Sequence, residues 1–424
     1  MFFRNALVWA FAAAITSAVA PAAFAQSSPA LTLTRALQRA LAANPRLTAA
    51  EKDIGIAIGR KIQAGAIPNP EVSFEVDNAL GSGDYRGFRS AETTLQLSQL
   101  IELGGKREAR VAAGVAELDS ARWERAALRL EIISETAAAF FNVLSAQRRI
   151  QIYDAHIASL DRLAPLLQRR VDAGASSPAE TARAQVAADL VRAERERTRT
   201  ALAVARRELA VLMGVNAPDF ALAVGDLSRV GRPPPFQTVL LGLDSNPQLI
   251  RWTAIRAQRD AELLSARLKP IPDLRIGVGW RHFRESNDNA VRLGVSIPIP
   301  TWDQNLGGIR VAEESRAKVD AERASSKAAL ILTLGKAYDT LAGSLREIEI
   351  LRSSAIPNAQ RAVEAVESGY GQGRFTLLEV LDAQSTAAQA ALRLEEALIR
   401  FHNSVAILEG LTGVPFRLSR EIPR

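Results

Sequence analysis

Two carboxylates, Glu379 and Asp382, are the residues of this sequence whose spacing most clearly suggests chemistry. They lie three positions apart just after a glycine-rich segment (369–373), so a helix starting there presents both on one face. Acids near a helix N-terminus complement the helix dipole, which accounts better for Glu379 than for Asp382. The other interpretation is a charged face that attracts cations.

No set of residues suited to catalysis accompanies this pair. The chain has no cysteine, which excludes disulfides, thiolate metal sites and cysteine nucleophiles. Its histidines (His156, His282 and His402) are too far apart for metal-ligand spacing, and there is no phosphate-binding loop or Ser/His/Asp set. We therefore expect no enzyme, no cofactor and no bound metal.

The basic balance of the chain does not indicate a nucleic-acid partner. The net charge is +7 and the isoelectric point is about 10. However, arginines alternate with acids, as in residues 192–197 and 206–208, which is typical of solvated helix faces.

The N-terminus has the pattern of a secretory signal peptide over residues 1–25. Arg4 precedes an apolar stretch too short to span a membrane, and Ala23-Phe24-Ala25 forms a cleavage site. No cysteine follows the site, so we do not expect a lipoprotein. No later run of about 18 apolar residues predicts a membrane helix.

The rest of the chain contains an internal sequence repeat. Asn44-Pro45 recurs as Asn246-Pro247, Gly104-Gly105 as Gly307-Gly308, and residues 212–215 as 411–414. These anchors keep their order with little drift, which indicates two tandem repeats. We place them at 26–232 and 233–424.

Each repeat predicts a helix, two strands, a very long helix, a turn and a shorter helix. The strands fall at about 71–99 and 273–299, where apolar residues such as Val72, Phe74 and Val76 alternate with polar ones. The long helices, about 105–172 and 306–368, carry coiled-coil spacing. Pro165 and Pro357 lie inside them and should bend them.

The strands have an apolar face that no helix of the repeat is free to cover, because the long helices already have a coiled-coil seam to bury. Lipid would cover it, with the charged face turned to water. Four strands cannot close a barrel, and open edges do not occur in hydrocarbon. Three chains with twelve strands are the simplest solution, so we expect a homotrimer in contact with outer-membrane lipid.

The motifs resemble those of a known family. The opening Leu33-Thr-Arg-Ala-Leu37 with Asn44-Pro45, and the turn at 369–383, are similar to TolC-like outer-membrane efflux proteins over essentially the whole mature chain. Residues 67–71 (Ile-Pro-Asn-Pro-Glu) and 97–107 resemble the heavy-metal efflux, or CzcC-like, branch.

The resemblance implies a mainly α-helical fold with a transmembrane β-barrel. A twelve-stranded trimeric barrel would sit in the outer membrane of a Gram-negative bacterium and continue as an α-helical tunnel through the periplasm. Its partners would be a periplasmic adaptor and an inner-membrane pump of the resistance-nodulation-division type. The branch favours divalent heavy metals as cargo. Drug efflux and type I protein secretion remain alternatives, and a structural coiled-coil protein is a third class.

The resemblance also directs attention to the turns. Glu379, Asp382 and Tyr370 would form the periplasmic aperture, where three chains gather six carboxylates. The matching positions of the first repeat, Glu180 and Arg183, do not form an acidic pair. Some relatives carry arginine where this chain has Phe375 and aspartate where it has Glu379, so an arginine-based lock is not carried over. The expected adaptor-docking residues are Gly174, Ala175, Ser176, Gly373, Arg374, Phe375 and Thr376.

Overall fold

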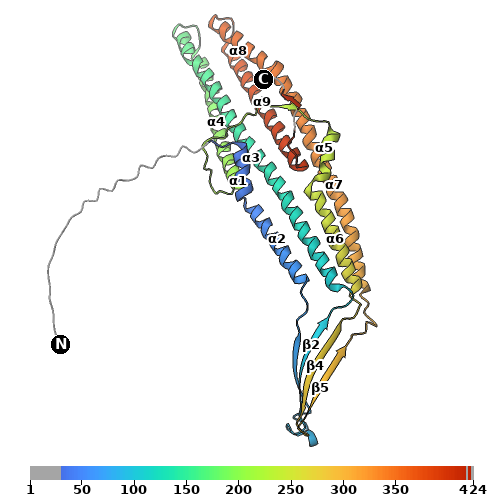
Figure 1. The fold of residues 1–424 in the computed structure, drawn as a ribbon. Coiled ribbons are helices and arrows are strands. Elements are labelled where there is room, and N and C mark those ends of the chain that lie inside the picture. Colours follow the sequence, from blue (N-terminus) through green and yellow to red (C-terminus); the bar gives the residue numbers. More distant parts are fainter. Residues whose placement is uncertain (1–29, 417–418, 422–424) are drawn as a thin grey trace, which may run out of the picture.

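The structure, a computed structural model, describes residues 30–416 and 419–421. The predicted signal peptide lies outside these residues. The described part is a long molecule with a four-stranded sheet at one end and helices over the rest of its length (Figure 1). Within it, no helix is long and apolar enough to cross a membrane.

The sheet is built from one hairpin of each repeat. The strands are β1 (Glu71–Asp77), β2 (Glu92–Ile101), β4 (Leu274–Phe283) and β5 (Asp288–Ser296), all antiparallel in the order β1-β2-β4-β5. The pairing of β2 with β4 joins the two repeats. Strands β1 and β5 form the two edges, and neither edge is paired within the described chain.

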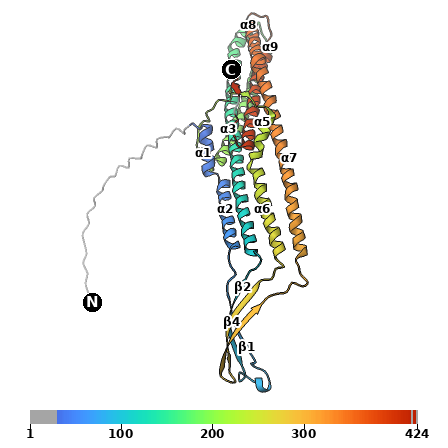
Figure 2. The same cartoon turned by 45° about the vertical axis from the view of Figure 1, so that its right-hand side comes forward.

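The register confirms the predicted alternation and aligns the apolar residues into rows across the sheet. Residues directly opposite one another share a face. One row is Phe74, Leu95, Trp280 and Val291, and the next is Val72, Leu97, Val278 and Leu293. All eight side chains are exposed. No described helix covers this face (Figure 2).

The helices form one curved layer in which shorter helices flank the long ones. In the first repeat, α3 (Lys106–Asp172) is flanked by α2 (Pro45–Ala64) near the sheet and α4 (Pro178–Leu212) further away. In the second, α6 (Pro247–Leu268) and α9 (Leu377–Thr412) flank α7 (Leu306–Ile350), and α8 (Ile356–Gly371) packs on α9. In each repeat, two shorter helices are thus stacked end to end beside the long one.

The second long helix is not the continuous α-helix that the sequence suggested for about 306–368. A π-helical turn, η3 (Leu351–Ala355), separates α7 from α8, and Pro357 follows two residues later. Proline has no N–H to donate, and its ring clashes with the carbonyl four residues earlier. A wider turn just before it relieves that clash. In the first repeat, α3 continues through Pro165 as an α-helix.

Short elements at mid-height surround the helices and complete the main core. They are α1 (Leu33–Ala43), η2 (Leu243–Ser245), α5 (Phe236–Gly242) and a small pair of strands, β3 (Gly231–Arg232) with β6 (Ser419–Glu421). The sequence patterns do not predict these elements. Phe140, Leu341 and Phe401 are fully buried in this core. A further 3₁₀ turn, η1 (Gly83–Tyr85), lies in the β1–β2 loop.

The repeated Asn-Pro motif has a structural explanation. The Asn44 side chain accepts a hydrogen bond from the Arg46 amide at the start of α2, and its Nδ2 donates to the Leu212 carbonyl at the end of α4, 2.9 Å away. Asn246 repeats this at the start of α6, donating to the Leu411 carbonyl at 2.7 Å. Both asparagines are buried. Each one therefore joins two helices stacked end to end.

Replacing this asparagine should separate its two roles. Asn44→Ala removes the cap and leaves the half-buried Leu212 carbonyl without this partner, a loss of about 2–4 kcal/mol. Asn44→Ser keeps a good capping residue and loses only the second bond, so a smaller effect is expected. The measurement is the thermal midpoint of the helical circular dichroism signal in detergent. A serine variant that melts with the wild type would show that the bond to Leu212 contributes nothing.

Candidate functional site

The polar face of the sheet carries a ladder of ion pairs. Arg281 contacts Glu92 at 2.8 Å and Asp77 at 3.8 Å, and its Nε donates to the Thr94 hydroxyl at 2.9 Å. Two further pairs are Arg275 with Glu71 and Arg292 with Glu75. The side chains of these ion pairs are between 21% and 63% exposed, so water reaches them. The sheet therefore has one wet face and one apolar face.

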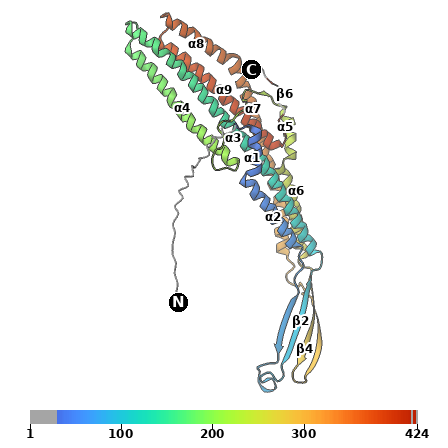
Figure 3. The ribbon, with the colours of Figure 1, turned by 60° about the vertical axis from the view of Figure 1, so that its left-hand side comes forward.

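The two predicted tips lie together at the opposite end of the molecule. The α3–α4 turn and the α8–α9 turn are both furthest from the sheet (Figure 3). Each ends its helix in the same way: the amide of Gly174 bonds to Val171 and that of Ala175 to Arg170, while Gly373 and Arg374 bond to Tyr370 and Gly369. Both glycines have positive φ, near +70°, which glycine adopts without strain.

The carboxylate of Glu379 is engaged in capping helix α9. Glu379 and Thr376 form a capping box, in which the Thr376 amide donates to Glu379 Oε2 at 2.7 Å and the Thr376 hydroxyl accepts from the Glu379 amide. Hydrogen bonds from Thr376, first from its amide, lower the pKa of the Glu379 carboxyl. The dipole-partner interpretation therefore applies to Glu379, whose charge nevertheless stays exposed to solvent.

Asp382 has a different environment. It is exposed on α9, one turn beyond Glu379, and makes no hydrogen bond or ion pair with the described residues. Its carboxylate is not used to hold the fold together. Of the two acids, Asp382 is the one whose charge has no structural role within the described chain.

Tyr370 lies inside the helix bundle and not on its surface. It is 1% exposed and packs with Leu167 of α3 and with Leu377 and Val380 of α9. Arg170 caps it from α3, with the guanidinium 4.8 Å from the ring centre and a hydrogen bond to the Tyr370 carbonyl. Burial raises the pKa of the Tyr370 phenol. The structure thus assigns Tyr370 to packing between the two tips, and its side chain does not sit with the two acids.

Sequence reasoning missed Arg170, because an arginine in a helix rich in arginine gives no signal of its own. Its role depends on the approach of the two turns, which lie 200 residues apart in the chain. Through Arg170 and Tyr370 the tip of one repeat is attached to the tip of the other.

The predicted adaptor-docking residues differ in how far their side chains are exposed to solvent. Six of the seven predicted residues are exposed and Ser176 is half-buried. Phe375 is 37% exposed because its ring lies over Gly369, where a Cβ atom would clash with it. Ser176 donates to Glu180, so the first tip uses its acid internally. A docking role for these residues stays a prediction.

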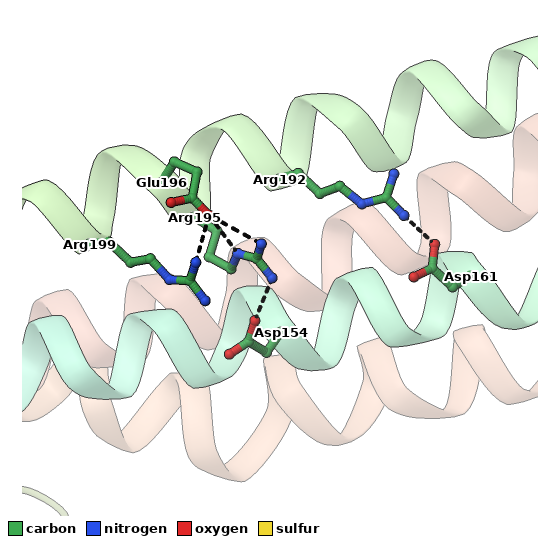
Figure 4. Close-up of polar contacts among 6 residues, drawn as sticks. All are labelled: Asp154, Asp161, Arg192, Arg195, Glu196 and Arg199. Carbon is green, nitrogen blue, oxygen red and sulfur yellow. Dashed lines mark hydrogen bonds and ion pairs between the residues drawn. The ribbon is translucent and has the colours of Figure 1, made fainter.

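Below the tip, ion pairs hold α4 against α3. Arg192 contacts Asp161 at 2.6 Å and Arg195 contacts Asp154 at 3.1 Å, while Glu196 accepts from Arg195 and Arg199 (Figure 4). Such exposed pairs each contribute only about 0–1 kcal/mol, but together they fix the register of the hairpin. This confirms that the arginine-rich segment 192–197 belongs to a solvated helix face. Within the described residues, no His, Asp and Glu side chains gather as a metal site would require.

The chain belongs to the outer membrane efflux protein family. The family model matches residues 36–215 and 241–414, one match in each repeat. The protein is therefore an outer-membrane efflux channel subunit and not an enzyme. The predicted fold class is confirmed: a mainly helical chain of two tandem repeats, with four strands that belong to a twelve-stranded transmembrane barrel and helices that extend into the periplasm.

Individual relatives agree with this assignment. The cobalt-zinc-cadmium resistance protein CzcC of Cupriavidus metallidurans is 31% identical over 90% of both chains. The nickel-cobalt-cadmium resistance protein NccC of Alcaligenes xylosoxydans is 25% identical over 69% of this chain and 67% of its own. A crystal structure of a membrane protein from Pseudomonas aeruginosa superposes with a TM-score of 0.78 at 18% identity, covering 90% of this chain and 92% of that one.

The two faces of the sheet should respond differently to charge. Val278→Arg places a cation in the apolar row and should cost roughly 2–4 kcal/mol near the bilayer midplane, which hinders insertion. Arg275→Ala, on the wet face, should leave insertion intact. The measurement is the amount of heat-resistant oligomer in outer-membrane fractions. Equal tolerance of the two changes would contradict the assignment of faces.

Proposed function

We propose that this protein is the exit duct of a tripartite efflux system that exports divalent heavy-metal cations. Three copies would close the barrel, a periplasmic adaptor would hold the tips, and an inner-membrane pump of the resistance-nodulation-division type would supply the energy. The observation that carries the cargo assignment is the similarity over 90% of both chains to CzcC, which is a cobalt-zinc-cadmium resistance protein.

The tip chemistry supports a cationic cargo. Glu379 and Asp382 keep their charges exposed at the end of the second repeat, and three copies would bring six carboxylates to the narrow end of the tunnel. A ring of this kind attracts cations and repels anions without binding them tightly. A duct that held its cargo firmly would not conduct.

Drug efflux and type I protein secretion are the alternatives. Ducts of these systems share the same architecture and differ in the pump they serve. The acidic tip does not separate these alternatives, because some relatives carry aspartate at the position of Glu379. The similarity to CzcC is what favours metal cations.

The aperture acids should set the ion preference of the isolated channel. Because Glu379 caps α9, an alanine there would disturb the turn, so the suitable variant is Glu379→Gln with Asp382→Asn. Glutamine retains the capping box while both charges are lost. We expect a smaller cation preference, read as the reversal potential under a salt gradient in a planar bilayer.

Glu180→Gln, at the matching site of the first repeat, is the control and should change the reversal potential much less. Salt screens a surface charge over about 8 Å at physiological strength, so only charges close to the ions contribute. If the double variant keeps the wild-type cation preference, the constriction lies elsewhere and the acids serve only the helix end.

The cargo itself is tested in cells. A strain lacking this protein, with its pump and adaptor intact, should become sensitive to zinc, cobalt or cadmium salts, and the wild-type gene should restore growth. The minimum inhibitory concentrations of organic drugs serve as the comparison. Loss of drug tolerance with unchanged metal tolerance would point to drug efflux instead.

A further inference from the structure

A connecting segment between α4 and α5 lies against helices of both repeats at mid-height. We call its residues 221–228 the strap. Gln147 of α3 exchanges two hydrogen bonds with the strap backbone, at 2.9 and 3.0 Å. From the second repeat, His402 Nε2 of α9 lies 2.9 Å from one strap carbonyl, and Arg352 of η3 donates to another at 2.7 Å. The strap is therefore a fixed surface that joins the first repeat to α9 and to the π turn.

A cavity of about 780 Å³ lies between the strap, α3, α9 and the π turn. It is open to solvent and combines an apolar wall with charged groups of both signs. The wall includes Leu394 and Leu398 of α9, and the charged groups are Arg148, Asp226, Arg352 and Glu395. An occupant of this cavity must therefore bring apolar surface together with charge.

The Glu395 carboxylate lacks a hydrogen-bond donor. The side chain is 6% exposed, and its Oε2 receives no hydrogen bond from the described residues. Arg148 Nε lies 3.6 Å from Oε1, which is too far for a hydrogen bond, and Arg148 donates to Gln151 instead. Burial raises the pKa of the Glu395 carboxyl, although Arg148, Arg352 and Arg149 act against this. A buried acceptor without a donor is unfavourable, so a donor from elsewhere would stabilise this site.

The strand β6 directs the chain towards the same cavity. It runs antiparallel to β3, with Glu421 opposite Gly231. The continuation of an antiparallel strand runs back along its partner, so the chain beyond Glu421 is directed along residues 228–230. Three residues span at most about 11 Å, which is enough to follow the partner from Gly231 back to Ser228. Ser228 belongs to the lining of the cavity.

The three residues that follow β6 have the chemistry that the cavity requires. Residues 422–424 are Ile-Pro-Arg and lie outside the described residues. The first two are apolar, and the guanidinium of the third has five N–H donors in a geometry that matches carboxylates. We propose that residues 422–424 dock into the cavity, with the guanidinium of Arg424 at the acidic groups Asp226 and Glu395. The docked segment would tie the strap to α9 and to the π turn.

Cross-linking between introduced cysteines tests the docking, because the chain has no cysteine of its own. Pro423→Cys is combined with Gln151→Cys, an exposed position of α3 at the edge of the cavity. The control combines Pro423→Cys with Gln185→Cys, an exposed glutamine of α4 outside the cavity. With a short bis-maleimide we expect roughly tenfold more cross-linking within one chain for the first pair, because thiols held together react at a high effective concentration. Mass spectrometry of the digested protein measures the joined fraction.

Charge variants of the Gln151–Pro423 pair test the recognition itself. Glu395→Gln with Asp226→Asn removes both acidic charges at nearly constant size, and Arg424→Gln removes the cation. Each should lower the cross-linked fraction by roughly threefold or more, because charge-assisted hydrogen bonds are lost. Glu396→Gln, an exposed neighbour that does not line the cavity, is the matched control and should have no effect.

Three outcomes would overturn the proposal. The first is equal cross-linking of the cavity pair and the control pair. The second is cross-linking between chains instead of within one chain, which would place the segment on a neighbouring copy. The third is full cross-linking in the Arg424→Gln protein. The amount of heat-resistant oligomer shows whether each variant assembles, and if the double acid variant does not, Arg424→Gln alone decides the question.

Discussion

The apolar face of the four-stranded sheet is the constraint on which the rest of the structure depends. Its rows of valine, leucine, phenylalanine and tryptophan are exposed, and no described helix covers them. At about 25 cal/mol per Å², such an area is too costly to leave in water. The edges β1 and β5 are also unpaired within the chain. Lipid outside and neighbouring copies at the edges satisfy both needs at once, and a water-filled lumen then accommodates the ion pairs of the other face.

The two repeats build a long molecule from the same few kinds of contact, each used twice. Each asparagine of the Asn-Pro motif joins two stacked helices, and each Gly-containing turn reverses the chain at the far end. The repeats then diverge where function requires it. The first tip engages Glu180 with Ser176, whereas the second leaves Asp382 free of contacts within the described residues. Among the described residues, only the second repeat has the long β5–α7 linker and a π turn, which lies between α7 and α8.

The features that could be predicted from the sequence are those with a period. Alternation along Val72–Val76 gave the strands and their faces, and the coiled-coil spacing indicated the long helices. Features set by distant contacts could not be predicted. Tyr370 is buried because Leu167 and Arg170, from the other repeat, pack on it. The capping box of Glu379 depends on one backbone turn, and the π turn before Pro357 is one of several ways to relieve the same clash.

The most direct test is the mass of the mature protein in detergent, determined by light scattering with the detergent contribution subtracted. If the exposed face is lipid-facing and the open edges are paired between chains, the protein component will be three chains, and it will aggregate when the detergent is removed. A monomer that stays in solution without detergent and retains its strand signal in circular dichroism would contradict the central claim.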